Sequence, residues 1–352
     1  MRVLLLAASA EPIWIPLLAL LLSLLVFAGF LLAVGNDPLA VFYAMYRGGF
    51  GSLFSWRNTL ERAAPLMLTA LCTALPAKLG MIMIGGEGAL VVGGVAAAYF
   101  GLMLNGAAPW VVITGMLVAG MCSGGLWIAV VAALKYWRGI NETIASLLFN
   151  YIAIALMNHW VTGPLRDPQS LNKPATLPIG SSNMLQDIPG LGVHWGLVFG
   201  LVLCMAYYLL FQLTTFGFSV RIIGGNLRAA RLVGLPVAKL TVLTCFFAGA
   251  AAGLAGMVEV AAVHGTANAS LAAGYGYAGI LVAFLARQNP LAIIPVALLL
   301  GGISASAGLL QRSQHLPDAT VLILQGIIFM AILFSETWYG RMQAGYERRA
   351  AA

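Results

Sequence analysis

Two acidic side chains lie beside or within long apolar runs, where a carboxylate is costly. Glu87 lies in Gly85-Gly86-Glu87-Gly88, and Glu259 lies near the end of an apolar stretch. Placing a carboxylate at the centre of a bilayer costs about 2.5–3.5 kcal/mol on insertion scales. Because glycines flank Glu87, its carboxylate could contact neighbouring backbone amides, which favours a residue that lines or gates a transport pathway. A plain loop position is the alternative for Glu87, and a position at the interface is the alternative for Glu259.

Two amides and two tyrosines are further candidates. Asn150 and Gln325 each lie inside an apolar run, where an amide that bonds a neighbouring helix contributes about 0.6 kcal/mol on average. Tyr275 and Tyr277 flank Gly276 at the start of another run, where they could anchor the helix at an interface or stack on a sugar ring or base. The candidate pathway residues are Gly86, Glu87, Asn150, Glu259, Tyr275, Tyr277 and Gln325.

Motifs for catalysis, metal binding and nucleotide binding are missing from the sequence. No phosphate-binding GxxxxGK[ST], HExxH or GxSxG pattern occurs, and no two carboxylates have catalytic spacing. The four cysteines and four histidines do not form metal-ligand spacings. We therefore expect no enzymatic activity, no metal site and no cofactor bound by this chain.

Composition indicates a membrane protein. Hydrophobic residues make up 61% of the 352 residues and charged residues only 8%, whereas soluble domains carry about 25% charged residues. The long apolar runs favour helices over a β-barrel, because each backbone group in lipid must be paired within its own segment. The net charge of +7 is spread over short loops rather than one patch, which argues against nucleic-acid binding.

The length of the apolar runs predicts an all-α polytopic protein with about ten transmembrane helices, some of them short or interrupted. Interruptions fall at Gly85–Gly88 and at Arg287–Pro290, at comparable places in the two halves, which is typical of a transport pathway. Tight cytoplasmic turns would give the same pattern. The expected spans are residues 14–34, 64–79, 89–104, 109–134, 143–160, 195–213, 240–260, 277–285, 291–309 and 321–334.

Loop charges predict the topology. With the N-terminus inside, twelve of the 18 basic residues fall in inside loops, as the positive-inside rule requires, and the C-terminus is also inside. Residues 1–352 then form a single transmembrane domain. Its outer loops are residues 36–63, with a turn at Gly48–Gly51 and an interfacial helix at Arg57–Arg62, and residues 161–193. Two GxxxG pairs, Gly120/Gly124 and Gly249/Gly253, indicate close helix packing.

The inside loop of residues 214–239 has a basic helical pattern. Arg228 and Arg231 are three residues apart and share a helix face, while Gly234-Leu235-Pro236 ends the helix. The pattern fits a short docking helix for a soluble partner, and a loop that serves only the positive-inside rule is the alternative.

Four stretches of the sequence resemble the branched-chain amino-acid/simple-sugar permease superfamily of ATP-binding-cassette (ABC) importers, in particular its nucleoside and simple-sugar branch. The long first outer loop resembles the larger of the two permease types in this branch. The four stretches span nearly the whole chain and keep the family's order. Met83, Ala89 and Ala278 depart from the usual residues, which weakens any inference about substrate. The stretches are Met83-Ile84-Gly85-Gly86-Glu87-Gly88-Ala89, residues 141–153, residues 221–234 and residues 274–290.

The resemblance implies a transmembrane permease subunit that moves a nucleoside or simple sugar inward by alternating access in a bacterial inner membrane. It implies an ABC ATPase partner that binds ATP and Mg²⁺, a second permease in a heterodimer, and a substrate-binding lipoprotein or periplasmic protein. An ion-coupled secondary transporter is the alternative, and it requires buried acid–base relays. By resemblance, the ATPase-coupling residues are Arg221, Gly224, Asn226, Arg228 and Arg231.

Overall fold

The computed structural model describes residues 2–170 and 173–350, and side chains are described from residue 18 to residue 335 within those ranges. The chain divides into two compact units. The first unit contains Met1–Trp56 and Gly302–Ala352, and the second contains Arg57–Gly301. The boundaries fall inside two helices, α3 (Leu53–Ala77) and α12 (Pro290–Ala305). Each unit is described by itself below.

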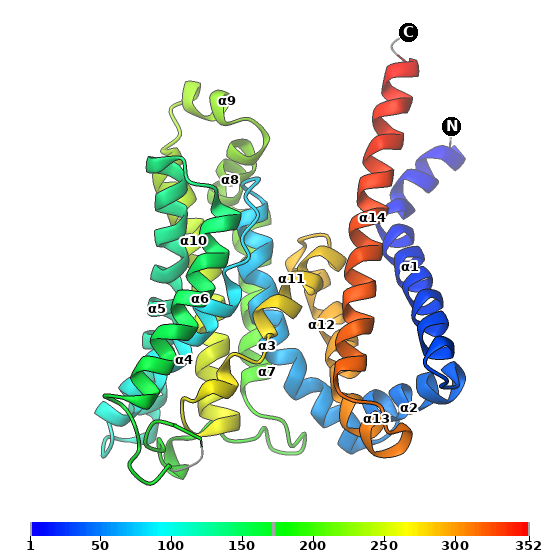
Figure 1. Cartoon of the computed structure of the whole chain (residues 1–352). Helices are drawn as coiled ribbons and strands as arrows, with labels where there is room; N and C mark the ends of the chain where they lie inside the picture. The colour runs from blue at the N-terminus through cyan, green and yellow to red at the C-terminus, as the bar shows by residue number, and fades with distance from the viewer. Residues whose placement is uncertain (1, 171–172, 351–352) are drawn as a thin grey trace. The chain divides into compact units, whose positions relative to one another are not determined.

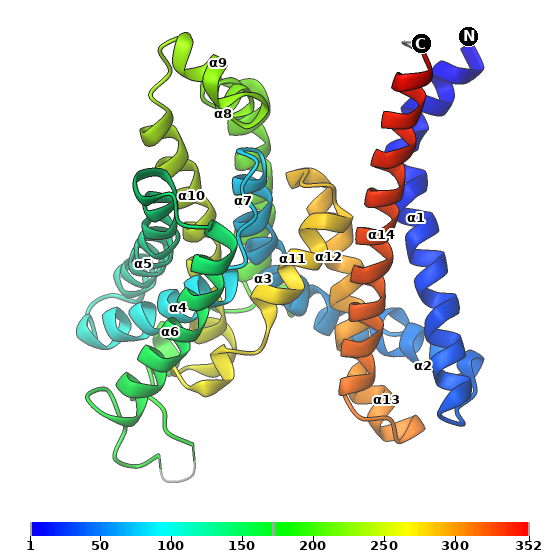
Figure 2. The same ribbon diagram turned by 45° about the horizontal axis from the view of Figure 1, so that its top comes forward.

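The first unit is built on two long helices from the opposite ends of the chain. Helix α1 (Arg2–Ala33) and helix α14 (Ala319–Ala350) lie side by side and antiparallel, so that both chain ends lie at the same end of this unit (Figures 1 and 2). Helix α2 (Pro38–Phe50) packs against α13 (Ala307–Gln314). Asp37 caps the N-terminus of α2, because its carboxylate accepts a hydrogen bond from the amide of Leu39.

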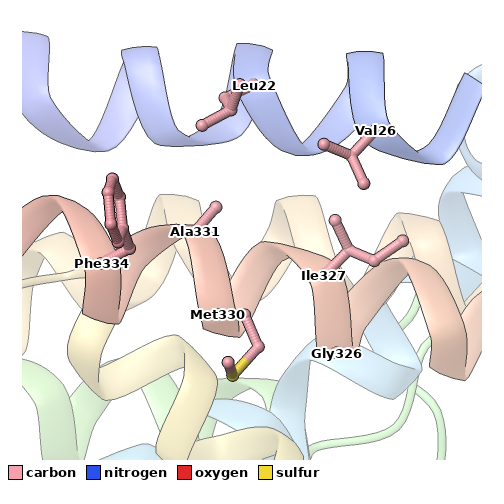
Figure 3. Close-up of a pocket in the computed structure, with 7 residues that line it drawn as sticks. All are labelled: Leu22, Val26, Gly326, Ile327, Met330, Ala331 and Phe334. Carbon is pink, nitrogen blue, oxygen red and sulfur yellow. The ribbon is translucent and has the colours of Figure 1, made fainter. Parts of the chain in front are cut away.

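A groove of about 320 Å³ runs between α1 and α14. Figure 3 shows Leu22 and Val26 of α1 facing Ile327, Ala331 and Phe334 of α14. Every side chain that lines the groove is apolar. It therefore offers no hydrogen-bonding side chain that could orient a polar ligand.

The predicted turn at Gly48–Gly51 is wrong, because Gly48 and Gly49 lie inside α2 and the turn begins at Gly51. A Cβ on Gly48 would lie 2.8 Å from the Cα of Ser306, and one on Gly49 would lie 2.7 Å from the carbonyl oxygen of Gly302. These glycines therefore permit close helix packing rather than a turn.

The separate interfacial helix predicted at Arg57–Arg62 is also wrong. These residues lie inside α3, which runs without a break from Leu53 to Ala77. Their charges are compatible with one continuous helix, because a change in hydropathy along a segment does not itself end a helix. Even Pro65 and Pro76 lie inside α3 without ending it.

The second unit carries most of the helices. Besides α3 and α12 it contains isolated β-bridges but no strand within the described residues. Helix α10 continues into a π-helix, Glu259–His264. The remaining helices of this unit are α4 (Gly86–Met103), α5 (Pro109–Arg138), α6 (Glu142–Thr162), α7 (Gly196–Leu213), α8 (Thr215–Gly225), α9 (Leu227–Leu232), α10 (Val237–Val258) and α11 (Tyr275–Leu285).

Glycines join the three central helices of this unit, α4, α5 and α10. A Cβ on Gly124 would lie 2.6 Å from the carbonyl oxygen of Gly249, and a Cβ on Gly253 would collide with the carbonyl of Gly120. Gly93 of α4 meets Gly253 as closely. The two predicted GxxxG pairs are therefore confirmed as packing surfaces, and they pack against each other.

The apolar helices confirm a polytopic all-α protein. Among the described residues, six helices are long and apolar enough to cross a membrane, or seven if α1 and α2, which meet at a bend of 120°, form one span. Shorter apolar segments occur at Ala269–Leu285 and Ala319–Ser335. The α8–α9 loop lies at the opposite end of the second unit from the segment that joins α6 to α7 (Figures 1 and 2).

The two predicted interruptions differ in outcome. The break at Arg287–Pro290 is confirmed, because α11 ends at Leu285 and α12 begins at Pro290. The break predicted at Gly85–Gly88 is displaced: Gly86 begins α4, and the extended stretch precedes it at residues 81–84. Glycine does not prevent a helix where neighbouring elements satisfy its backbone, and such contacts were not visible in the local sequence.

Candidate functional site

The Glu87 carboxylate joins the beginnings of two helices. Glu87 lies in the first turn of α4 and is only 1% exposed. Its Oε1 accepts a hydrogen bond of 2.7 Å from the amide of Gly274, and its Oε2 accepts one of 2.6 Å from the amide of Gly276. These amides belong to the first turn of α11, whose N-cap is Gly274. The carboxylate thus satisfies unpaired amides at one helix N-terminus while lying at another, and both positions favour negative charge.

Glycine at position 276 allows this arrangement. A Cβ on Gly276 would collide with the amide nitrogen of Glu87 and would lie 2.7 Å from the carbonyl carbon of Gly86. Gly274 has a φ of 87°, in the left-handed region that favours glycine. We call Glu87, Gly274 and Gly276 the carboxylate clamp. The clamp brings Gly86, Glu87 and the start of α11 together, although about 190 residues separate them in sequence.

Asn150 fixes the other side of the α4 N-terminus. It is fully buried in α6, and its Oδ1 accepts a 2.8 Å hydrogen bond from the amide of Gly88. Its Nδ2 donates to the carbonyl of Ile84 at 2.8 Å and to the hydroxyl of Tyr277 at 3.5 Å. All of these partners are protein groups, so the geometry favours the interhelical-bond interpretation of Asn150.

Two further α6 side chains, which sequence reasoning missed, hold the extended segment before α4. Thr143 donates to the carbonyl of Ile82 at 2.9 Å, and Ser146 accepts from the amide of Ile84 at 3.0 Å. With Asn150 they follow the i, i+3, i+7 spacing of one helix face. That spacing was present in the sequence, but its partner segment was not visible there.

The tyrosines of α11 have different environments. The hydroxyl of Thr69, on α3, donates to the backbone carbonyl of Tyr275 at 3.0 Å. The Tyr275 side chain packs against the hydrophobic core of the unit, whereas Tyr277 is 40% exposed. Of the two predicted aromatic contacts for a ligand, Tyr277 is therefore the accessible one. Thr69 was not identified as functional from the sequence.

Glu259 begins the π-helix at the end of α10. It is 5% exposed, and its carboxylate lies 3.7 Å from Nε2 of His264, at the other end of the same π-helix. Single-turn π-helices are rare and occur often at functional sites. This contact, however, is local to this turn, so it does not join Glu259 to the carboxylate clamp.

Gln325 belongs to the first unit. Its Nε2 donates to the hydroxyl of Ser304 at 2.9 Å, which joins α14 to α12. This contact agrees with the interpretation of Gln325 as an interhelical bond. The remaining pathway candidates, Gly86, Glu87, Asn150, Glu259, Tyr275 and Tyr277, belong to the second unit.

The short helix predicted after Asn226 is confirmed as α9 (Leu227–Leu232). The side chain of Asn226 accepts hydrogen bonds of 3.0 Å from the amides of Arg228 and Ala229, so Asn226 is its N-cap. Gly234, with a φ of 79°, follows the helix. Arg228 and Arg231 are both exposed.

Exposed apolar side chains accompany the two arginines of α9. Leu232 is 89% exposed and Val233 is 73% exposed. The α9 surface therefore combines positive charge with uncovered apolar area, as protein interfaces often do.

Arg221 and Gly224 have a different role from the α9 arginines. The Arg221 guanidinium donates to the carbonyl of Phe211 at 2.6 Å and to Oε1 of Gln212 at 3.0 Å, at the C-terminus of α7. A Cβ on Gly224 would collide with the carbonyl oxygen of Lys78. Both residues thus hold α8 against the rest of the unit, although the Arg221 side chain is exposed, as are those of Arg228 and Arg231.

The polytopic helical fold is that of a membrane protein, and the carboxylate clamp and the exposed α9 both belong to its second unit. A family model described as the permease component of the branched-chain amino acid transport system matches residues 55–333. The chain therefore belongs to this family of ABC-transporter permeases, as the four sequence stretches predicted.

Similar proteins cover nearly the whole chain. It is 30% identical to the glucose ABC transporter permease protein TsgB13 of Haloferax volcanii, over 96% of this chain and 93% of the relative. It is 29% identical to the guanosine ABC transporter permease protein NupP of Bacillus subtilis, over 91% and 93%. It is 26% identical to a second guanosine permease protein of that organism, NupQ, over 81% and 92%.

Proposed function

We propose that this chain moves a nucleoside or a simple sugar inward across a bacterial inner membrane by alternating access. The names of its relatives support this substrate class, because glucose and guanosine permeases both match the chain over most of its length. The clamp supports alternating access, since it ties α11 to α4 through one side chain at a point where both helices begin. Because one side chain makes this contact, α4 and α11 could adopt two discrete arrangements, one with the contact made and one with it broken.

The geometry of α9 is the observation that supports coupling of this chain to an ATPase subunit. A capped helix that exposes two arginines and two apolar side chains has no described partner that explains its surface. We propose that Arg228 and Arg231 contact an ABC ATPase, and that Asn226 shapes the helix that presents them. Arg221 and Gly224 transmit movement of this loop to α7 and α3, because they hold α8 in place.

The proposed topology has about ten crossings with both termini in the cytoplasm. The position of the two chain ends at one end of the first unit supports a shared side for both termini. The separation of the α8–α9 loop from the α6–α7 segment in the second unit supports opposite sides for these loops. The whole chain then forms a single transmembrane permease, with the α8–α9 loop facing the cytoplasm.

The proposed assembly contains further subunits. ATP and Mg²⁺ bind to the ATPase partner, and this chain binds no cofactor or metal. The similarity to both NupP and NupQ, two guanosine permeases of one organism, supports a heterodimer with a second permease. A lipoprotein or periplasmic binding protein would deliver the substrate, and nucleic acid has no part in the assembly.

Reconstitution tests this proposal. The chain would be copurified with its ATPase and second permease, placed in liposomes, and supplied with binding protein and labelled guanosine or glucose. Uptake should require ATP and should survive collapse of ion gradients. Uptake that needs a proton or sodium gradient but no ATPase would overturn the proposal in favour of a secondary transporter.

A further inference from the structure

The carboxylate of Glu259, at the end of α10, receives no hydrogen bond from the described part of the chain. Its side chain is 7% exposed, and its ion-pair partner among the described residues is Nε2 of His264 at 3.7 Å, which is beyond hydrogen-bond distance. Burying a charge is costly unless the charge is both paired and hydrogen-bonded. The two oxygens of Glu259 are not sealed from solvent, in contrast to the partnerless Nδ1 of His194. They can therefore accept hydrogen bonds from water or from a ligand.

The hydroxyl of Tyr275 is a second polar group with unused hydrogen-bonding capacity in this region. Glu259 is the charged residue that acts most strongly on this hydroxyl, so the two side chains lie near each other. No described residue bonds the hydroxyl, and it is not sealed from solvent either. Tyr275 is the first residue of α11, beside the carboxylate clamp. Its hydroxyl can both donate and accept a hydrogen bond.

Arg62 of α3 brings a positive charge to the same region. Thr69, two turns further along one face of α3, donates to the carbonyl of Tyr275 at 3.0 Å, so this face packs against the start of α11. The Arg62 side chain is exposed, and its charge acts on both Glu259 and Tyr275. A positive charge here disfavours a cationic ligand for Glu259.

These side chains suit a neutral ring that carries neighbouring hydroxyl groups. An ionised carboxylate has two oxygens and only accepts, so it can bind two O–H groups at once. Such charge-assisted hydrogen bonds are roughly twice as strong as neutral ones. We propose that Glu259 accepts hydrogen bonds from two neighbouring hydroxyls of a sugar ring, with the Tyr275 hydroxyl as a further partner. The ring is either a free monosaccharide or the ribose of a nucleoside.

Glu259 lies toward the outer end of the second unit, and in this respect the inference rests on the proposed function. The segment between α6 and α7 covers the π-helix, because the amide of Leu185 donates to the carbonyl of Ala261 at 2.8 Å and that of Ile179 donates to Gly265 at 3.0 Å. This segment lies at the opposite end of the unit from the α8–α9 loop, which faces the cytoplasm in the proposed topology (Figures 1 and 2). An imported ring therefore meets Glu259 on the side from which it enters.

Saturation-transfer NMR titrations test this inference on the purified permease–ATPase complex without binding protein. The probes are two pairs that differ by one hydroxyl: guanosine with 2′-deoxyguanosine, and D-glucose with 2-deoxy-D-glucose. Loss of the hydroxyl should weaken binding to the wild-type complex about tenfold to a hundredfold, as expected for one hydrogen bond to a charged group. In Glu259→Gln this ratio should fall to about threefold, because glutamine offers a single neutral acceptor.

Two variants serve as comparisons. Tyr275→Phe should weaken binding of both members of a pair about threefold and leave their ratio unchanged, because the carboxylate is still present. Glu142→Gln is the matched control and should keep the wild-type ratio, since Glu142 begins α6 at the end remote from the α6–α7 segment and pairs with Lys135. Glu259→Asp, which withdraws the carboxylate by one methylene, replaces Glu259→Gln if that variant does not fold.

The ratios separate the two sources of the ring and decide the inference. A ratio above threefold for the guanosine pair alone supports a nucleoside, and one for the glucose pair supports a monosaccharide. The inference is overturned if both pairs bind the wild-type complex without discrimination, or if the variant at Glu259 keeps the wild-type ratio.

Uptake by the reconstituted wild-type complex is measured in parallel. A complex that transports guanosine or glucose but does not discriminate within the pairs refutes this inference alone. A complex that transports neither compound refutes the proposed substrate class.

Discussion

Glu87→Gln tests whether the carboxylate clamp holds the fold. The two carboxylate oxygens accept hydrogen bonds from Gly274 and Gly276, at 2.7 and 2.6 Å. Glutamine keeps one acceptor oxygen and turns its NH₂ group toward the other amide, so that two donors face each other. The lost charge-assisted bond and the unpaired buried amide together should lower the free energy of unfolding by about 2–4 kcal/mol.

The midpoint of thermal unfolding should then fall by about 5–15 °C, at about 2–4 °C per kcal/mol for a unit of this size. A thiol-reactive dye can follow the unfolding in detergent, because Cys72, Cys204 and Cys245 are buried and react only when the fold opens. The exposed Cys122 is replaced by alanine in every variant to remove the background.

Glu142→Gln is the matched control. The Glu142 carboxylate pairs at 2.7 Å with Lys135, and the side chains are 12% and 41% exposed respectively. Pairs of this kind contribute about 0–1 kcal/mol, so this variant should unfold close to wild type. Equal midpoints for Glu87→Gln and Glu142→Gln would refute the clamp. A Glu87→Gln protein of wild-type stability that no longer transports would instead assign Glu87 to the substrate pathway.

Three further predictions concern helix packing and coupling. Gly253→Ala should destabilise the protein by about 1–3 kcal/mol, because the added Cβ collides with the carbonyl of Gly120. Gly326→Ala is the control and should leave stability unchanged, because the space around its Cβ is open. Dye-monitored unfolding compares the two variants. Arg228→Glu with Arg231→Glu should abolish ATP-driven uptake in a permease that still folds, and unchanged uptake would show that α9 does not dock the ATPase. Asn226→Ala removes the α9 cap, at a cost of about 1 kcal/mol, and should reduce transport. It should lower ATPase binding, measured by copurification, less than the double arginine variant does.

Much of the local structure could be predicted from the sequence. The runs predicted at residues 109–134 and 143–160 lie within α5 and α6, and the helix after Asn226 is α9. Each prediction used only local information: apolar length, a capping side chain, and a glycine or proline that ends a helix. The packing role of the GxxxG pairs could also be predicted from the sequence. Helices in a membrane pack closely only through small residues, whichever neighbouring helix is the partner.

The contacts of the candidate site could not be predicted in this way. The sequence pointed to Glu87 and to backbone amides, but not to the amides of Gly274 and Gly276, which lie nearly 190 residues away. Local patterns also misplaced the turn at Gly48–Gly51, since the residues that fill the space beside those glycines come from α12 and the turn after it.

Apolar length, helix caps and small-residue spacing are properties of adjacent residues, so the sequence alone determined the membrane class, several helix ends and the short helix after Asn226. Whether a buried polar group is paired depends on which distant segment reaches it. Tertiary structure therefore decided that Glu87 joins two helix N-termini, that Asn150 bridges α6 to α4, and that no described residue donates a hydrogen bond to Glu259. The physical reason is that hydrogen bonds in a low-dielectric interior are strong only at short range and in a fixed geometry, which only the folded chain supplies.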